Sequence, residues 1–497
     1  MSKHSITVFF TSTLVMGLML TACIPVTNTN PSTYNTQTQT PAATGDTINE
    51  TTTAENNTST PTANTFQTVQ TPEEPLPATS PSGNAPGGSA ASSPTFSSLY
   101  KLDGAIADLT DQIYTATGTD QSAVFVTGIG KLSLSGATIT TSGDTSSSEL
   151  SSVEGLNAAV LANSASTIDL SKSTITTSGS GANGIFAEGS GSAVLLENVQ
   201  ILTDGEYAHG ISVSNAASMT LTDVDITTTG AHAAAVASDQ GGGTITIING
   251  NINTTGQESP GLYSTGTLTI DNTTISSTQA EAAVIEGTNS ISVTNSRLTS
   301  SAADLWGVLI YQSMSGDAEG TDGIFTMSGG SLTYTGNTGA LFHITNSTGF
   351  INLKDVEISV ASGILVNAST GTWGVSGANG GTVIFTADEQ VLTGNILADN
   401  LSSLTLSLQN ASILTGAINP ENTAQSVNLM LDSTSTWNVT ADSYLTCLSI
   451  TGEITGTEIS NITGNGYTVY YDPDTCTDLN GQVYSLAGGG YLKPEGE

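Results

Sequence analysis

The phrase "SMTLTDVDITTTG" (218–230) decides the fold, because the chain repeats it with small changes. Two close copies are "TLTIDNTTISST" (267–278) and "SISVTNSRLTSS" (290–301). Each copy alternates apolar and polar residues and carries an Asp or Asn at the same offset. Self-similarity at a short fixed period indicates a solenoid or a related repeat architecture.

An isoleucine or leucine near the end of each copy marks the period. Most steps between these anchors are 23–26 residues, and the longer steps fit one period with an insertion or two periods. The residues five and seven positions before each anchor are always apolar, which predicts a strand with one buried face. The anchors are Ile139, Ile175, Ile201, Ile226, Ile252, Ile275, Leu298, Leu332, Ile358 and Ile413.

The residue three positions before the anchor predicts a sharp corner. Nine of the ten are Asn, Asp or Gly, which tolerate the left-handed αL conformation. A hairpin would need two such residues together, so we expect one strand to turn a corner directly into the next. The corner residues are Gly136, Lys172, Asn198, Asp223, Asn249, Asn272, Asn295, Gly329, Asp355 and Asn410.

A third short apolar strand follows in each period after a variable loop, as in "GIFAEG" (184–189) and "GLYSTG" (261–266). Three short strands and one tight corner in roughly 25 residues predict one coil of a parallel β-helix, each coil about 4.8 Å above the last. One coil cannot bury its own core, but a stack of coils buries a continuous apolar column. The chain is therefore expected to be all-β, with a single rod.

The corner pattern resembles that of right-handed parallel β-helices of the pectate-lyase-like class, over residues 98–440. The resemblance implies three short strands per coil. It does not imply one function, because the class holds lyases, hydrolases, tailspikes and adhesins.

The end of the chain adds a second resemblance. "STWNVTADSYLTCLSITG" (435–452) resembles the capping segment of autotransporter adhesin passengers, and residues 464–494 resemble the ending of some secreted bacterial β-helix proteins. We expect a small β cap over 441–497, with a lipid anchor in place of a membrane barrel. A cap would cover the open end of the apolar column.

The N-terminus has the pattern of a targeting segment. Lys3 precedes the apolar run "ITVFFTSTLVMGLML" (6–20), and "LTAC" (20–23) resembles the bacterial lipobox. We expect a lipoprotein signal peptide over 1–22 and lipid attachment at Cys23, which anchors the chain without a spanning helix. An ordinary signal peptide followed by a chance cysteine is the alternative. Either way the chain is expected outside the cytoplasmic membrane, in the bacterial envelope.

Residues 23–97 predict a disordered tether. They are rich in Thr, Ser, Asn and Pro, contain no Lys or Arg, and hold ten of the fourteen prolines. Such a sequence cannot bury enough apolar surface to offset its ordering entropy, and its prolines favour an extended chain.

Charge excludes several partners. Seven Lys and Arg face 43 Asp and Glu, for a net charge of −36. Nucleic acid is therefore not an expected partner, because neutralising phosphates takes basic residues. Anionic polysaccharides and anionic bilayer surfaces are disfavoured for the same reason.

The sequence offers no catalytic constellation and no cofactor motif. Between 98 and 440 the basic residues are Lys101, Lys131, Lys172, Arg297 and Lys354. A polysaccharide lyase or hydrolase of the resembled class would need a basic residue that abstracts a proton, or clustered carboxylates with His and Arg. Of the motifs of that class, only the dipeptide His209-Gly210 appears. We therefore expect no enzyme.

Two histidines and two acidic segments are weak candidates for metal or proton chemistry. His209 and His232 lie about one coil apart, near Asp204 and Glu206, and would be either a metal or acid–base site or two solvated loop residues. Two further segments offer carboxylate oxygens of the kind Ca²⁺ prefers, or simply form exposed acidic turns. Their side chains are Asp317, Glu319 and Asp322 in one, and Asp472, Asp474, Asp478 and Asn480 in the other.

Cys447 and Cys476 are the remaining cysteines after Cys23. In an exported protein such a pair favours a disulfide, here across the cap. The strand "YLTCLSI" (444–450) equally fits a buried free thiol, so both states remain open.

Five large apolar residues occupy alternate positions of the third strands: Phe186, Tyr263, Ile285, Leu309 and Phe342. If they face outward, they form a row on which sugars stack. If the assignment is wrong by one residue, they point into the core, and this second interpretation is the one we favour.

These features together predict a lipid-anchored surface rod with an adhesive or structural role. Its expected contacts are glycans or surface proteins of other cells or matrix. The alternative is a carbohydrate-binding or polysaccharide-degrading β-helix protein.

Overall fold

A computed structural model of the chain describes residues 94–451 and 454–496, and the structural statements below concern these residues. The expected signal peptide 1–22, the lipidation site Cys23 and nearly all of the tether 23–97 lie outside the described residues. Within the described ranges, no helix has the length and apolar content that a membrane crossing requires.

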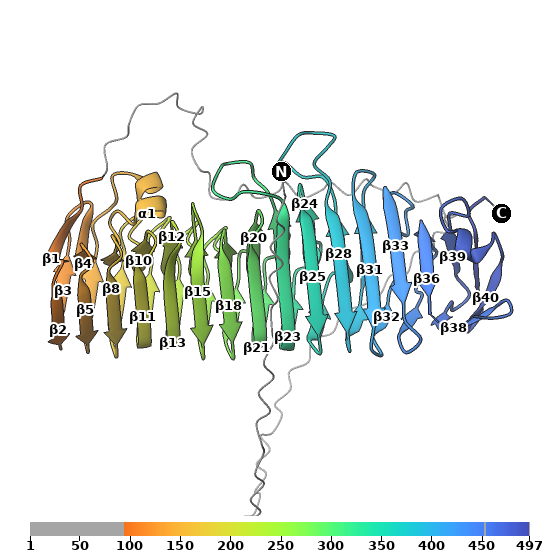
Figure 1. Ribbon diagram of the computed structural model, residues 1–497, viewed down its shortest axis with the longest axis horizontal. Coiled ribbons are helices and arrows are strands. Elements are labelled where there is room, and N and C mark those ends of the chain that lie inside the picture. Colours follow the sequence, from red (N-terminus) through yellow and green to blue (C-terminus); the bar gives the residue numbers. More distant parts are fainter. Residues whose placement is uncertain (1–93, 452–453, 497) are drawn as a thin grey trace, which may run out of the picture. The chain divides into compact units, whose positions relative to one another are not determined.

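The described chain folds as a parallel β-solenoid whose coils stack along one axis (Figure 1). Its strands form three long sheets, and almost all neighbours in them are parallel. Sheet A contains β1 (Ser97–Asp103), β4 (Gln121–Thr127), β7 (Val160–Ala162), β10 (Ile185–Glu188), β12 (Ile211–Ser214), β14 (Val236–Ser238), β17 (Leu262–Ser264), β20 (Ala283–Glu286), β22 (Val308–Tyr311), β24 (Phe342–Thr345), β27 (Ile364–Ala368) and β30 (Asn395–Ala398).

Sheet B holds the first two strands of most coils. It contains β2 (Ile106–Thr110), β3 (Ile113–Ala116), β5 (Lys131–Ser135), β6 (Thr138–Thr141), β8 (Thr167–Ser171), β9 (Thr174–Thr177), β11 (Ala193–Thr203), β13 (Ala217–Thr228), β15 (Gly243–Ile248), β16 (Asn251–Thr254), β18 (Thr267–Asp271), β19 (Thr274–Ser277), β21 (Ser290–Ser300), β23 (Asp322–Tyr334), β25 (Thr348–Lys354), β26 (Glu357–Val360), β28 (Thr382–Asp388), β31 (Ser403–Gln409), β33 (Ser426–Leu431) and β36 (Cys447–Ile450).

Sheet C belongs to the last coils and the C-terminal end. It contains β29 (Val391–Thr393), β32 (Ile413–Thr415), β34 (Thr436–Asn438), β35 (Ser443–Leu445), β37 (Ile454–Thr455), β38 (Glu458–Thr463), β39 (Thr468–Tyr471), β40 (Tyr484–Ala487) and β41 (Tyr491–Pro494). The described helices are α1 (Ser148–Glu154) and the short 3₁₀ helix η1 (Thr477–Leu479).

The inward positions of the repeat form the core, as the sequence predicts. The twenty residues five and seven positions before the anchors are all buried, none more than 3% exposed. In the phrase that opens the sequence analysis, Met219, Leu221 and Ile226 lie in the column, opposite Ile245, Ile247 and Ile252 of the next coil. Each such side chain contributes roughly 1.5–3 kcal/mol of apolar burial.

All ten predicted corner residues have a positive φ, which confirms the αL corners. Asp223 has φ 54° and Lys172, the one residue that is not Asn, Asp or Gly, has φ 51°. The amides also bond from coil to coil: Asn249 Nδ2 donates to Asp223 Oδ1 at 3.1 Å, and Asn272 Nδ2 donates to Asn249 Oδ1 at 2.7 Å. The corner row is therefore an amide ladder as well as a set of turns.

One anchor was assigned one residue too early. Ile413 is only half-buried, and Leu414 faces the core in its place. The reason is local: Asn410 and Ala411 both have positive φ, 57° and 64°, so this corner takes one residue more than the others. Because side chains alternate along a strand, one extra residue exchanges the inward and outward faces.

The turn between the second and third strands contains a glycine stack that periodicity of apolar residues does not reveal. A Cβ on Gly205 would lie 1.9 Å from the carbonyl oxygen of Gly179, and one on Gly230 would lie 1.9 Å from that of Gly205. Only a residue without a side chain allows this approach. The sequence signal is a Gly two residues after each buried threonine that ends a second strand, as at Thr177 and Gly179.

The two ends of the solenoid are built differently. At the C-terminal end, parallel pairing continues beyond residue 440 through β41, and antiparallel pairs β37–β38 and β40–β41 close the last coils. At the other end, β1, β2 and β3 pair with β4, β5 and β6 and have no partner among the described strands on their other side.

Candidate functional site

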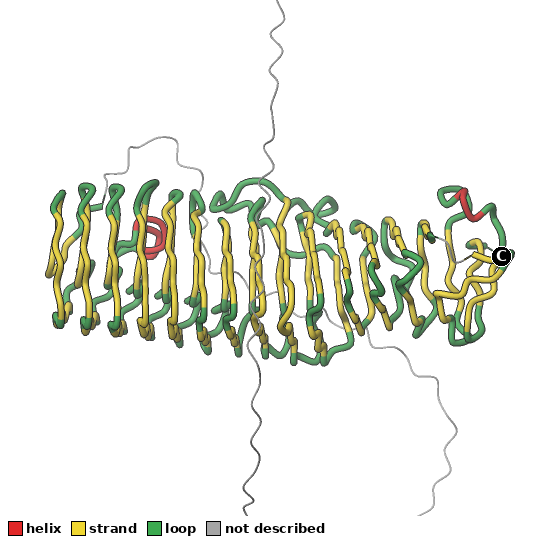
Figure 2. Tube along the Cα trace, turned by 60° about the horizontal axis from the view of Figure 1, so that its bottom comes forward, coloured by secondary structure: helices red, strands yellow, loops and turns green. Residues whose placement is uncertain are grey.

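The outer face of sheet A is where the insertions of the solenoid collect. Helix α1 and two long loops, here called loop 312–321 and loop 369–381, lie beside this sheet (Figures 1 and 2). Helix α1, which the sequence analysis did not predict, is capped by Ser147, whose side chain accepts a bond from the Leu150 N–H at 3.2 Å. It is fixed to β12 by Ser214 Oγ, which donates to the Val153 carbonyl at 2.6 Å.

A small apolar cluster fills the outer face of sheet A in the N-terminal coils, near α1. It consists of Phe125, Ala158, Leu161 and Phe186, with Phe96 packed against it at a ring distance of 5.2 Å from Phe125. These side chains are separate from the core column, so they point outward from the sheet and are nevertheless buried.

A second cluster fills the same face further along the rod. Tyr311 and Trp373 lie with ring centroids 4.6 Å apart, and Trp306 stacks on His343 at 4.1 Å. Two of the three tryptophans of the chain therefore meet here, under the two loops. Its buried apolar members are Val284, Trp306, Leu309, Tyr311, Ala340 and Trp373.

The five large residues of the third strands do not form one row. Ile285 and Phe342 point into the core column, as favoured from the sequence. Phe186, Tyr263 and Leu309 point outward and pack in the two outer clusters, so for them the inward assignment was wrong. The third strands are short and apolar on both faces, so alternation could not distinguish the faces.

Glu286 is the polar centre of the second cluster. It is 1% exposed, and its carboxylate accepts hydrogen bonds from the hydroxyls of Tyr311 (2.9 Å) and Tyr263. The N–H of Ser313 also donates to it at 3.2 Å, and so does the Ser313 hydroxyl, which fixes the start of loop 312–321. Burial, then the Glu286 charge, raises the pKa of both tyrosines well above its usual range.

Asp239, which directly follows β14, is a titratable group near this cluster with a raised pKa. It is half-buried, and its pKa is raised to about 7, first by burial and then by the carboxylate of Asp317 in loop 312–321. Glu286 adds to the effect, and the Gln240 N–H, which donates to Asp239 at 2.6 Å, opposes it. Asp239 thus holds a proton up to about neutral pH.

His209 and His232 do not come together. The local period is 25 residues, so His232 lies over Tyr207, with ring centroids 5.0 Å apart, and not over His209. His232 Nδ1 lies 3.0 Å from Glu258 Oε2 of the next coil. Burial lowers the pKa of His209 to about 4, so this side chain is neutral near pH 7.

The two acidic segments use part of their oxygens within their own turns. Asp317 Oδ2 accepts from the Ser315 hydroxyl at 2.8 Å, and Asp472 Oδ1 accepts from the Asp474 N–H at 2.9 Å. No group of three or more His, Cys, Asp or Glu side chains suited to hold a metal ion occurs in 94–451 or 454–496. Calcium binding at either segment stays a prediction.

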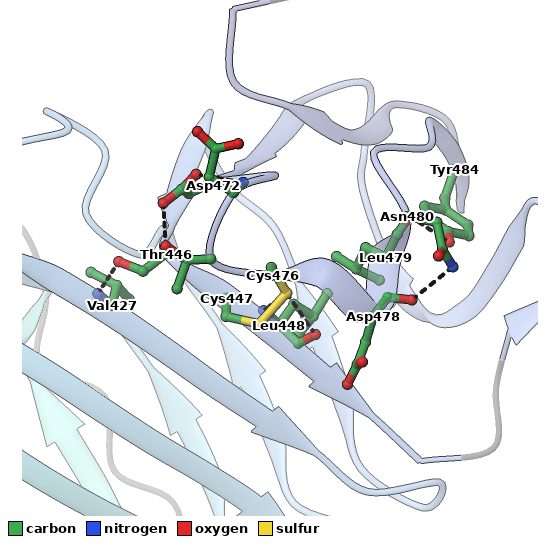
Figure 3. Close-up of a disulfide and its surroundings, with 12 residues drawn as sticks. Val427, Thr446, Cys447, Leu448, Asp472, Cys476, Asp478, Leu479, Asn480 and Tyr484 are labelled. Atoms are coloured by element: carbon green, nitrogen blue, oxygen red, sulfur yellow. Dashed lines mark hydrogen bonds between the residues drawn. A yellow bond between two sulfur atoms is a disulfide. The ribbon is translucent and has the colours of Figure 1, made fainter.

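Cys447 and Cys476 are joined by a disulfide in the structure, with their Cα atoms 4.8 Å apart (Figure 3). Cys447 begins β36, and Cys476 directly precedes η1. The Leu448 N–H points at Cys476 Sγ at 3.3 Å. The bond links a strand of sheet B to the segment that leads into the last coil.

The outer face of sheet B is mostly polar, and the large apolar residues exposed on it are Ile106, Ile113, Leu195, Leu202, Ile248, Ile324 and Met430. One outward row runs through nine consecutive coils: Thr138, Thr174, Gln200, Asp225, Asn251, Thr274, Arg297, Ser331 and Glu357. Where this row meets the corner ladder, a shallow hollow is lined by the side chains of Asn272, Asn295, Arg297 and Glu357. Arg297 is the only arginine of the sequence.

A glycine pair forms one corner beside the hollow. A Cβ on Gly330 would lie 2.0 Å from the Ser296 carbonyl oxygen, and one on Gly329 would lie 3.0 Å from Asn295 Oδ1. The two glycines therefore let this corner pack closely against the coil before it. Among the described residues Arg297 forms no ion pair, so its guanidinium is available on this face.

Comparison with known proteins agrees with this architecture. A family model described as a right-handed beta helix region matches residues 158–339. No curated protein matches the chain. The match and the parallel solenoid together make the fold a right-handed parallel β-helix, a fold that surface proteins and polysaccharide-related proteins share.

Proposed function

We propose that this right-handed β-helix is an adhesin-like or structural protein of the bacterial cell envelope, held at the membrane by lipid on Cys23. The observation that carries the proposal is the contrast between its faces. On the outer face of sheet A two clusters of packed side chains lie under α1 and the two loops, whereas the outer face of sheet B carries an exposed polar row from coil to coil along the rod.

The chemistry of this polar row favours a neutral, hydroxyl-rich partner. Ser, Thr and Asn side chains donate and accept hydrogen bonds without requiring a charged ligand. The net charge of −36 repels polyanions. The hollow around Arg297 adds a cation and the carboxylate of Glu357 to the same surface, so a glycan or a polar protein surface fits it best.

Binding to a glycan array by the chain from Ile24 onward tests this assignment. We expect neutral glycans to bind and the variant Arg297→Ala to lose about tenfold in affinity, since charge-assisted hydrogen bonds are worth roughly 1.5–3 kcal/mol. The control Lys354→Ala removes a positive charge from the same sheet outside the hollow and should bind as the unmodified chain does. Equal losses in both variants would point to net charge and not to the hollow.

A second candidate function, a polysaccharide hydrolase, has one observation in its favour. Asp239 holds a proton near neutral pH, and Asp317 and Glu286 lie close enough to influence it. A protonated and an ionised carboxyl at a suitable separation are what glycoside hydrolysis uses.

A turnover assay on a polysaccharide panel separates the two functions. On the adhesin proposal no polysaccharide is shortened. If one is shortened and Asp239→Asn abolishes the reaction while Asp322→Asn does not, the hydrolase assignment replaces the adhesin.

Anchoring is tested independently through Cys23. A fatty-acid probe should label the chain in cells, and Cys23→Ser should abolish the labelling because the thiol carries the lipid. Persistent labelling of the variant would refute attachment at this residue.

A further inference from the structure

The N-terminal end of the solenoid leaves its apolar column open. Tyr100, Ala107, Leu109 and Tyr114 point inward but are only half-buried. Their register partners one coil further in are at most 2% exposed: Val124, Leu132, Leu134 and Ile139. The difference arises because no described coil lies beyond β1, β2 and β3.

The same end carries exposed apolar side chains and free strand edges. Ile106 is 82% exposed, Ile113 77%, Ile129 70% and Leu99 49%. The outer edges of β1, β2 and β3 have backbone groups without a strand partner among the described residues. Unpaired edges with apolar surface are a template for pairing with another chain, and solenoids normally carry polar caps there.

The chain directly before this end is poorly suited to cover it. Between Gln70 and Ser93 the one large apolar residue is Leu76, and five prolines interrupt the segment. Proline lacks the N–H that a ladder requires, and a coil cap needs apolar residues on its inner face. The segment next to the open end therefore does not have the sequence of a coil cap, and a second chain can supply the three complementary strand edges.

A second copy supplies such a surface. A two-fold axis perpendicular to the rod, passing through β1, sets β1 antiparallel to its own copy and β2 against β3 of the other copy. Opposed residues in an antiparallel pair share a face, so a register that aligns inward residues joins the two apolar columns. The strands are of similar length, five residues in β2 and four in β3, which suits this exchange.

We propose that two copies of the chain dock N-terminal coil to N-terminal coil through β1, β2 and β3, forming one continuous rod with a sealed cap at each end. The interface is isologous and closes on itself, so assembly stops at the dimer. The caps formed by β37–β38 and β40–β41 prevent further growth at the outer ends. The inference is independent of which ligand or reaction the lateral faces serve.

Repulsion between the two acidic copies makes the proposed dimer sensitive to salt. Both copies are strongly acidic, and the docking coil itself carries Asp103, Asp108 and Asp111 against Lys101. Like charges across the interface repel, and salt screens this repulsion. The dimer should therefore strengthen as ionic strength rises, the opposite of an association driven by ion pairs.

Sedimentation of the chain from Ile24 onward tests the proposal. All described elements lie after residue 93, so this shortened chain keeps every one of them. We expect a concentration-dependent dimer with a dissociation constant in the micromolar range, tighter at about 0.5 M salt than at about 0.1 M. A chain that stays monomeric at about 100 µM in both salts overturns the proposal.

A pair of variants locates the interface. Leu109→Glu puts a charge at the open end of the column, where the half-exposed site tolerates it in the monomer, and should weaken the dimer at least about tenfold. The control Ser133→Glu lies one coil inward on the outer face and should leave the dimer unchanged. Circular dichroism confirms that both variants fold. If Leu109→Glu dimerises as the unmodified chain does, or Ser133→Glu loses the dimer equally, the docking surface lies elsewhere.

Hydrogen exchange distinguishes the proposed dimer from a cover formed by the preceding residues of the same chain. In the proposed dimer, protection of β1–β3 amides increases with protein concentration. Protection that is high and independent of concentration would mean that the chain's own preceding residues cover the end, and would overturn the proposal.

Discussion

Asp223 carries a carboxylate that could suggest catalysis, but its role in the structure is to form a corner. It sits in αL with φ 54° and accepts a hydrogen bond from the Asn249 amide of the next coil. Asn, Gly and one Lys occupy the same position elsewhere, so the site requires a conformation and not a carboxylate. Asp is therefore present at this position because it tolerates the αL conformation, and no catalytic role is needed to explain it.

A second row, inside the rod, consists of threonines whose buried hydroxyls lack hydrogen bonds. Thr141, Thr177, Thr203, Thr228 and Thr254 stack in register at the end of the second strands and are at most 1% exposed. Their hydroxyls are buried and have no hydrogen-bond partner among the described residues. The β-branched shape suits the strand, while the hydroxyl costs free energy.

We therefore expect Thr203→Val to raise the free energy of unfolding by about 1 kcal/mol, because valine keeps the shape and removes the buried hydroxyl. Urea unfolding measures the change. The control Thr176→Val, on the outer face of the preceding coil, should change it by less than about 0.5 kcal/mol. A loss of stability in Thr203→Val would show that the hydroxyl is hydrogen-bonded in solution.

At the scale of elements, the insertions decide the character of sheet A. Helix α1 and loops 312–321 and 369–381 convert its outer face from a surface into two satellite clusters. Glu286 holds the start of loop 312–321 by its bonds to Ser313, and the tyrosine hydroxyls of two neighbouring coils complete its shell. The outer face of sheet A carries aromatic side chains of the kind on which sugars stack, but the insertions cover them.

The acidity of Asp239 gives this region a pH dependence. The pKa of Asp239 in the folded chain, about 7, lies above its ordinary value of 3.8, so its contribution favours folding below about pH 4 and is lost as pH rises through 7. We expect Asp239→Asn to stabilise the chain at pH 8 by on the order of 1–3 kcal/mol and to have little effect near pH 4.

Thermal unfolding at both pH values measures this difference. The matched control is Asp322→Asn, an exposed acid of the same region. An equal effect of Asp239→Asn at the two pH values would contradict the raised pKa.

At the scale of the whole molecule, the antiparallel strand pairs close the C-terminal end of the solenoid, and a disulfide cross-links it. The disulfide between Cys447 and Cys476 closes a loop of sequence separation 29 beside the last coils. Such a loop restricts the unfolded chain and stabilises the fold by roughly 3 kcal/mol. The expected exported location is compatible with an oxidised pair.

We expect the double variant Cys447→Ser, Cys476→Ser to lower the free energy of unfolding by roughly 3 kcal/mol. Hydrogen exchange should rise first in β39–β41, because these strands close the rod, while β11 and β13 stay protected. Reduction of the unmodified chain should reproduce the effect. If the variant loses nothing, the two cysteines are not paired in solution.

The coil could be predicted residue by residue because its signals are local. The αL corner needs particular residue types, and the two inward positions before each anchor need apolar ones, so a single sequence reports both. The prediction was wrong where a local detail changed the count, as at Ala411, whose positive φ moved Leu414 into the core. It was also incomplete for α1, which lies in an insertion without a period.

The sequence by itself determined the strand order, the corners, the apolar column and the polar character of sheet B, because each of these repeats with the coil and depends on neighbours within one period. Tertiary structure alone decided which outward residues are covered: Phe186 and Leu309 are buried, and Glu286 meets Tyr263, Tyr311 and Ser313 from neighbouring coils. It also decided that Cys447 and Cys476 meet and that, among the described residues, no coil covers the N-terminal end of the column. These outcomes depend on how insertions and ends fold back over the rod, and no short-range pattern encodes a contact between segments so far apart in the chain.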